Sequence, residues 1–223
     1  MSKVAVLHTS FVFVTVEPVI TDLIGELIPD AEILHFVDSD VLATVVREQG
    51  ISNRSEQRMV HLAQAAEAAG ADVIFSACSS LGPTLDAAQL AVSVPVVKID
   101  EAMAVAAMQY ERIGVLATVP TTLGPTSDLI AAKAAAAGRA PQITRMLCDG
   151  AFDILMGGDR EAHDQLVVDQ AMVLAKDVDV IVLAQASMQR LKQRLHDQTG
   201  LPVLSSPRMG VEHLAQIVLE QTA

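Results

Sequence analysis

Short runs rich in β-branched residues alternate along the chain with longer stretches of helical period, and this alternation constrains the fold more than any other feature. The runs are almost continuously apolar, which is typical of strands that are buried on both faces. Such strands, separated by helices, indicate an α/β protein with a parallel sheet. We expect strands at residues 4–7, 32–36, 73–75, 94–99, 113–116, 143–147, 180–183 and 202–204.

Helix signals lie between these runs. Within residues 55–69, apolar side chains recur at the spacing of one helix face. Asn53 and Glu56 are expected to cap this helix, and Asp159 is expected to open a later one.

The second part of the chain repeats the first. Residues 72–75 (Asp-Val-Ile-Phe) match residues 179–182 (Asp-Val-Ile-Val), an offset of 107 (179 − 72). Residues 94–96 match residues 201–203 at the same offset. Any two α/β units look somewhat alike, but one offset that holds across successive strands favours a true repeat.

We therefore expect two similar α/β halves, each with a four-stranded parallel sheet flanked by helices. The first half would contain residues 1–97 plus 207–223, and the second would contain residues 98–206. Ligands of open α/β sheets bind beyond the carboxyl ends of the strands. If the two halves are related by a pseudo-two-fold axis, those ends face each other, so the active site is expected in the cleft between the halves.

Composition excludes several classes of function. Lys and Arg total 15 against 27 Asp and Glu, a net charge of −12, which disfavours partners such as nucleic acid or an anionic membrane surface. Trp is absent and aromatics are 3%, too few for a base-stacking platform. No apolar run is long enough to span a membrane, and no export signal is evident. A cytoplasmic protein with reduced thiols is expected.

Cys78 is the strongest candidate for chemistry. It follows the strand expected at residues 73–75 and precedes Ser79 and Ser80, which begin a turn that leads into a helix. Backbone N–H groups and a helix dipole there would favour a thiolate. The same N–H groups and the two hydroxyls could hold a carboxylate. The alternative is a small buried side chain, a common role for cysteine.

The segment Ser76-Ala77-Cys78-Ser79-Ser80, repeated half a chain later by Leu183-Ala184-Gln185-Ala186-Ser187-Met188, resembles the aspartate/glutamate/hydantoin racemase superfamily. The resemblance extends over essentially the whole chain, including the loop Thr118-Val119-Pro120-Thr121-Thr122 and the Gly158-Asp159 before a long helix. It implies two Rossmann-like halves with the site between them and no cofactor. It also implies carbon-acid chemistry on small carboxylates, as in the racemases, maleate isomerase and arylmalonate decarboxylase.

In the racemases of this superfamily, each half supplies one cysteine. The first is present as Cys78, whereas the repeat offset places Gln185 at the second position (78 + 107). A primary amide forms hydrogen bonds but does not transfer protons near neutral pH. Two-thiol racemisation is therefore not expected. The decarboxylase branch also keeps one cysteine, but in its second half, so this chain mirrors it.

The resulting hypothesis is a cofactor-independent isomerase or decarboxylase that acts on a small carboxylate through Cys78 alone. Hydroxyls, an amide and backbone groups would bind the substrate and hold an enediolate intermediate. The expected binding residues are Ser10, Ser79, Ser80, Thr118, Thr121, Thr122, Gln185, Ala186 and Ser187. The alternative is a non-catalytic small-acid binding protein that lost its second thiol. The sequence leaves open a homodimer or a higher homo-oligomer.

Other residues carry weaker signals. None of the six histidines has metal-ligand spacing, and there is no glycine-rich phosphate loop, so neither a metal nor a nucleotide cofactor is expected. Cys148 is expected to be structural, and His163 is expected to be a solvated helix residue. Whether His8 assists the reactive thiol stays open, as does whether Lys98 and Arg208 meet an anionic group or lie on the surface.

Overall fold

The computed structural model describes residues 1–15 and 18–222. The chain forms two compact units, one made of Met1–Ile99 and Pro207–Ala223, the other of Asp100–Ser206. The first unit is therefore discontinuous, and the chain passes between the units twice. The division into domains at residues 1–97 plus 207–223 and 98–206 stays a prediction.

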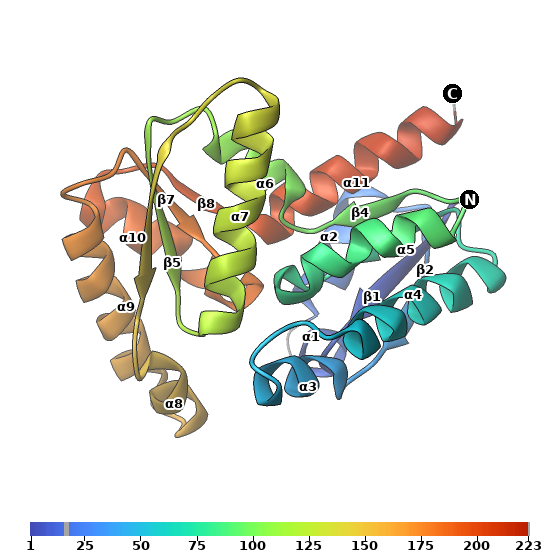
Figure 1. Ribbon diagram of the computed structural model, residues 1–223, viewed down its shortest axis with the longest axis horizontal. Coiled ribbons are helices and arrows are strands. Elements are labelled where there is room, and N and C mark those ends of the chain that lie inside the picture. Colours follow the sequence, from blue (N-terminus) through green and yellow to red (C-terminus); the bar gives the residue numbers. More distant parts are fainter. Residues whose placement is uncertain (16–17, 223) are drawn as a thin grey trace. The chain divides into compact units, whose positions relative to one another are not determined.

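The first unit is a four-stranded parallel sheet in the order β2-β1-β3-β4. Figure 1 shows α4 and α5 running together along this unit. Its strands are β1 (Lys3–His8), β2 (Glu32–Val37), β3 (Val73–Ser76) and β4 (Val96–Lys98). Its helices are α1 (Val12–Thr15), α2 (Val19–Leu27), α3 (Val41–Arg47), α4 (Asn53–Ala68), the 3₁₀ helix η1 (Ser79–Thr84), α5 (Leu85–Ala91) and α11 (Ser206–Thr222).

The second unit repeats this topology, with a four-stranded parallel sheet in the order β6-β5-β7-β8. Its strands are β5 (Arg112–Ala117), β6 (Gln142–Leu147), β7 (Val180–Leu183) and β8 (Val203–Ser205). Its helices are α6 (Glu101–Ala107), α7 (Pro120–Ala136), α8 (Ala151–Met156), α9 (Arg160–Leu174), the 3₁₀ helix η2 (Ala186–Leu191) and α10 (Lys192–Thr199). The predicted fold class, two four-stranded parallel sheets flanked by helices, is confirmed.

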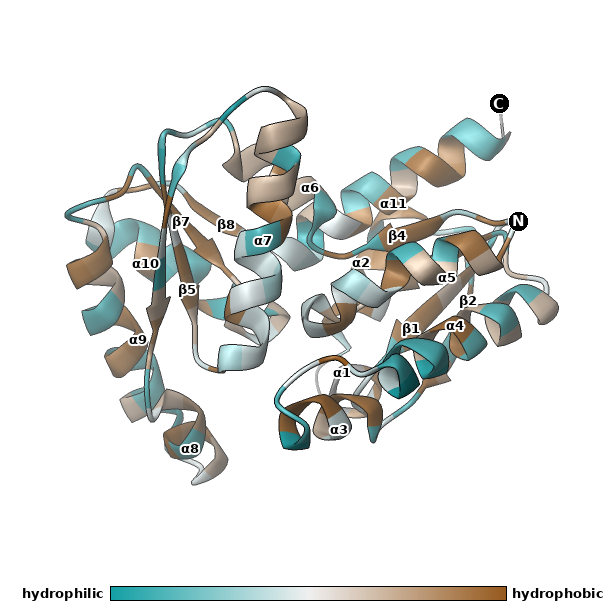
Figure 2. Cartoon of the chain, viewed as in Figure 1, coloured by the Kyte–Doolittle hydropathy of each residue, from teal (hydrophilic) through white to brown (hydrophobic). Residues whose placement is uncertain are grey.

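Each unit has its own core. In the first, Leu7 of β1 packs in one cluster with Met59 of α4 and Leu85 of α5. In the second, Leu116 of β5 packs with Val167 of α9. Figure 2 shows the inner strands as hydrophobic elements, which matches their burial on both faces.

Two local predictions need correction. The cap of α4 is Ser52, whose hydroxyl accepts the N–H of Ser55, because Ser52 is still extended whereas Asn53 is already helical. The strand expected at residues 94–99 is also shorter, as β4 spans three residues. The side-chain amide of Gln89 on α5 bonds the carbonyl of Val94, just before β4, and the N–H of Val96, its first residue, so backbone groups on the outer edge of this segment are occupied by a side chain. Asp159 does cap α9, since its carboxylate accepts the N–H of Ala162.

Candidate functional site

The carboxyl edge of the first sheet carries Thr9, Ser10 and the segment from Cys78 to Ser80. β1 and β3 are neighbours with Leu7 opposite Ser76, and the N–H of Ala77 continues the ladder to the carbonyl of Leu7 at 3.0 Å. Because the pairing continues to this point, the residues just after each strand emerge beside each other. The predicted residues Ser10, Cys78, Ser79 and Ser80 thus share one edge of the first unit.

Cys78 has an extended backbone and immediately precedes η1. Its side chain is half-buried and packs against the core cluster of the first unit, while Ser79 and Ser80 are buried. The turn expected at residues 79–84 is the six-residue 3₁₀ helix η1, with Pro83 inside it, and the helix expected after it is α5, which begins at Leu85. The N–H groups that follow Cys78 directly along the chain therefore belong to η1, ahead of α5.

His8 ends β1 next to this edge, but its side chain contacts another histidine. Its Nε2 lies 3.1 Å from Nδ1 of His35 on β2, and it is 1% exposed. Burial, together with nearby His35, lowers the pKa of His8 to about 4, so its ring is neutral near pH 7. Successive strand residues point to opposite faces, and Leu7 is the residue that faces the cluster around Cys78. The hydrogen bond that the structure describes for the His8 side chain is therefore the one to His35.

The carboxyl edge of the second sheet brings Gln185 and Thr118 into contact. Leu116 of β5 lies opposite Leu183 of β7, and Thr118 and Gln185 each come two residues after a member of this pair. The Gln185 Oε1 atom accepts the N–H of Thr118 at 2.6 Å, the Thr118 hydroxyl at 3.1 Å and the N–H of Val119 at 3.3 Å. The predicted residues Thr118 and Gln185 are therefore joined within the second unit.

The other predicted residues of the second unit begin the helices that follow these strands. Pro120 is the first residue of α7, and Thr121 beside it is half-buried. Thr122 is buried, and its hydroxyl donates to the carbonyl of Val119 at 3.2 Å. Ala186 and Ser187 are half-buried in the first turn of η2. Hydroxyl and amide groups therefore line this edge.

Cys78 and Gln185 hold equivalent positions in the two units. Each is extended, with φ −128° and ψ 109° at Cys78 and φ −134° and ψ 136° at Gln185. Each directly precedes a six-residue 3₁₀ helix. The sequence offset of 107 residues therefore corresponds to a repeated local structure, with a thiol in one copy and an amide in the other.

His163 is buried, so its expected solvated position was wrong. Its Nδ1 lies 2.7 Å from Oδ1 of Asp164, and Arg190 of η2 contacts both carboxylate oxygens and lies 3.2 Å from the same Nδ1. Burial raises the pKa of Asp164, but the hydrogen bonds from Arg190 and His163 outweigh it and hold this pKa below its usual range. This cluster anchors η2. Val167 lies one turn after His163 and is also buried, so its apolar side chain was the sequence signal that could have placed His163 on the buried face of α9.

The remaining candidates contact residues within their own units. Cys148 is fully buried in the core of the second unit, and burial raises the pKa of its thiol to about 12, so it stays protonated and inaccessible. Lys98 pairs with Asp86 of α5 at 2.7 Å, and Arg208 of α11 pairs with Glu26 of α2 at 2.9 Å. Both cations are therefore engaged in ion pairs within the first unit.

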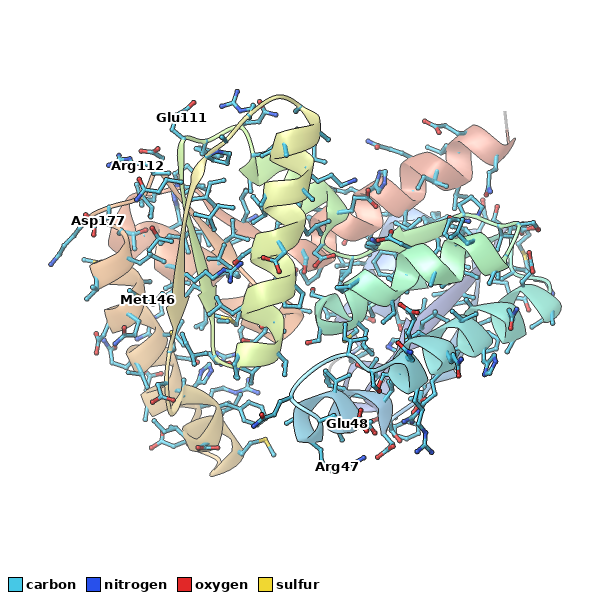
Figure 3. The ribbon with its side chains drawn as sticks, in the orientation of Figure 1. Arg47, Glu48, Glu111, Arg112, Met146 and Asp177 are labelled. Atoms are coloured by element: carbon cyan, nitrogen blue, oxygen red, sulfur yellow. The ribbon has the colours of Figure 1, made fainter. Side chains whose placement is uncertain are left out.

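The opposite, amino-terminal edge of the second sheet is held by an ion pair. Figure 3 labels Glu111, Arg112 and Asp177 at this end of the unit. The guanidinium of Arg112 on β5 bonds the carboxylate of Asp179, which precedes β7. The candidate residues all lie at the other edge, as the rule for open α/β sheets requires.

Within residues 1–15 and 18–222, no cluster of three or more His, Cys, Asp or Glu side chains could hold a metal ion. In the same described part of the chain, no helix combines the length and apolarity needed to cross a membrane.

Comparisons with known proteins identify the family and the fold. The family model of Asp/Glu/hydantoin racemases matches residues 14–214. A glutamate racemase from Bacillus anthracis is 20% identical with a TM-score of 0.77, covering 99% of this chain and 82% of its own. An allantoin racemase from Klebsiella pneumoniae is 18% identical with a TM-score of 0.68, and the match covers 99% of this chain and 89% of the racemase. An arylmalonate decarboxylase is 14% identical with a TM-score of 0.55, and the match covers 97% of this chain and 92% of the decarboxylase.

A search of curated proteins gave no significant match. At these identities the solved structures establish the shared fold, and the family model establishes membership: the chain belongs to the Asp/Glu/hydantoin racemase family.

Proposed function

We propose that this protein is a cofactor-independent isomerase or decarboxylase that acts on a small carboxylate through one proton-transfer residue, Cys78. The observation that carries the proposal is the repeated strand-end position, which holds a thiol in the first unit and an amide, Gln185, in the second. The racemase and decarboxylase relatives supply the reaction class, carbon-acid chemistry next to a carboxylate. That both edges serve one site follows from the resemblance and stays a prediction.

The chemistry assigned to Cys78 is proton transfer at the carbon next to the carboxylate. In isomerisation, the thiolate takes the α-proton, the C–H electron pair moves into the carboxylate to give an enediolate, and the Cys78 thiol returns the proton to a different carbon that is conjugated with this enediolate in an unsaturated acid. In decarboxylation, a C–C bond breaks, CO₂ leaves, and the thiol protonates the remaining enediolate. Ser10, Ser79, Ser80 and nearby backbone N–H groups stabilise the negative charge as it develops on oxygen.

Gln185 makes a fast two-thiol racemase the less favoured form of this activity. Racemisation by two bases needs a proton donor on each face of a planar carbanion. An amide supplies no such proton near pH 7, and loss of a general acid or base typically costs ~10²–10⁴ in rate. The proposal is therefore one-base chemistry, with the proton delivered on one face.

A second candidate function is small-acid binding without turnover. The observation that favours it is the same amide, because a racemase fold that lost one thiol would still hold a carboxylate at its hydroxyl-rich edges. The two functions differ in whether any substrate is converted.

The test is turnover of a panel of hydroxy, keto and malonate-type acids, with Cys78→Ser as the variant and Cys148→Ser as the matched control. Replacing sulfur by oxygen changes the volume little but raises the pKa of the group far above the working pH. We expect Cys78→Ser to lose at least ~10²-fold in kcat at an unchanged Tm, and Cys148→Ser to keep wild-type kcat. A near-normal kcat in Cys78→Ser refutes the assignment, and a wild type inert toward every acid it binds favours the binding protein.

A further inference from the structure

We infer that Gln185 is a specificity-determining residue: its amide is held so that the N–H₂ group is the donor offered to the ligand, which selects an oxygen acceptor and excludes an ammonium group at this position. The substrate class that follows is a small acid with a second carboxylate or carbonyl group in place of the α-amino group of an amino acid. This inference rests on the proposed function, because it takes the carboxyl edge as the binding site.

The orientation of the amide follows from its partners. The backbone N–H groups of Thr118 and Val119 both donate to one atom of the Gln185 amide, the Oε1 position, with N···O distances of 2.6 and 3.3 Å. A backbone N–H is always a donor, so only the amide oxygen fits there. A flipped amide would direct N–H groups against N–H groups. The Nε2 atom must therefore lie on the side away from the Thr118–Val119 turn.

The contacts leave Nε2 available to a ligand. Gln185 is half-buried, and among the described residues no hydrogen bond uses its Nε2, whereas Oε1 accepts three. The three bonds hold the side chain before a ligand arrives, so little rotamer entropy is lost on binding. Ser187, two residues further along the same edge, is also half-buried.

The same bonds remove an anion site that the backbone would otherwise offer. The N–H groups of Thr118 and Val119 lie at the turn before α7, and Oε1 of Gln185 already occupies both. A substrate carboxylate must therefore bind through Nε2 and the nearby hydroxyls. A positively charged ammonium group would meet the N–H₂ donors, an unfavourable contact that discriminates against amino acids.

Matched ligand pairs test this inference by calorimetric binding. Phenylmalonate and phenylglycine differ by a carboxylate in place of an ammonium group, and methylmalonate and alanine form a smaller pair. The wild type should bind at least one dicarboxylate, and each one it binds should bind more tightly than its amino-acid partner. Gln185→Glu keeps an oxygen for the Thr118 and Val119 N–H groups but replaces the donor with an acceptor. We expect it to weaken dicarboxylate binding roughly 10- to 100-fold.

Gln185→Leu separates specificity from a merely structural role. If Gln185 only fastens the turn, Gln185→Leu lowers Tm, while Gln185→Glu binds dicarboxylates like the wild type, and the inference is overturned. Tighter wild-type binding of the amino acids, or no binding of either dicarboxylate, also overturns it.

Binding does not require the thiol to react. A Cys78→Ser variant that keeps turnover, combined with the expected Gln185→Glu effect, would refute the proposed function and leave this inference standing.

Discussion

Gly210 is the position where one added methyl group should disturb the fold of the first unit most. It lies in α11, where the chain has returned to this unit, and an added Cβ would meet the carbonyl oxygen of Ile99 at 2.3 Å. Ile99 is the last residue before the chain leaves the unit. The contact therefore joins the point where the chain leaves the first unit to the helix with which it re-enters that unit.

The size of the effect follows from this contact. The neighbour is backbone, which cannot swing aside as a side chain does, so the overlap falls at the upper end of overpacking costs, about 3 kcal/mol. Replacing a helical glycine by alanine returns about 1 kcal/mol in helix propensity. The net loss for Gly210→Ala is about 2 kcal/mol, which lowers Tm by roughly 4–8 °C in a chain of this size.

Thermal unfolding followed by circular dichroism measures this loss, and Gly25→Ala is the matched control. Gly25 lies in α2, and an added Cβ there meets nothing within 4 Å. The control should gain about 0.5–1 kcal/mol. If Gly210→Ala stabilises the protein as much as Gly25→Ala does, α11 does not pack on Ile99 as described and the reasoning fails.

Two further predictions concern stability. The pKa of His8 falls from 6.5 to about 4 on folding, so the neutral ring that the folded state requires costs nothing above pH 6.5. As the pH falls from 6.5 toward 4, protonation of His8 in the unfolded state lowers the free energy of unfolding by up to about 3 kcal/mol. Urea unfolding of His8→Gln should show a shallower decline over this range, and an identical decline would contradict the assignment. Ser52→Ala should cost about 1 kcal/mol of unfolding free energy because it removes the cap of α4, whereas Asn53→Ala should cost little. Equal losses in the two variants would argue against Ser52 as the cap.

The sequence predicted the strands, their parallel pairing and the two-fold repeat because burial on both faces leaves a local signature. It also predicted that Cys78 and Gln185 take equivalent positions, since both follow matching strands. The hydrogen bonds between Gln185 and Thr118 were not predictable in this way. They join residues 67 positions apart, and hydropathy says nothing about which strand-end groups bond each other.

Charged and polar side chains account for most of the remaining differences. Lys98 and Arg208 are engaged by Asp86 and Glu26, partners that only the packed helices bring near. His163 was assigned to solvent because a histidine on a helix is usually exposed, although its buried contacts depend on Arg190 of a separate segment. The cytoplasmic location stays a prediction, and the sequence left the oligomeric state open.

The most direct test of one-base chemistry is to follow configuration and α-deuterium together in D₂O. The wild type is incubated with L-aspartate, L-glutamate and one enantiomer of a 2-aryl acid, and optical rotation and deuterium content are measured over time. With Cys78 as the single proton-transfer residue, any deuterium enters with retained configuration, and neither amino acid racemises efficiently. Rapid racemisation of L-aspartate or L-glutamate by the wild type, with α-deuterium in both enantiomers, would contradict the account.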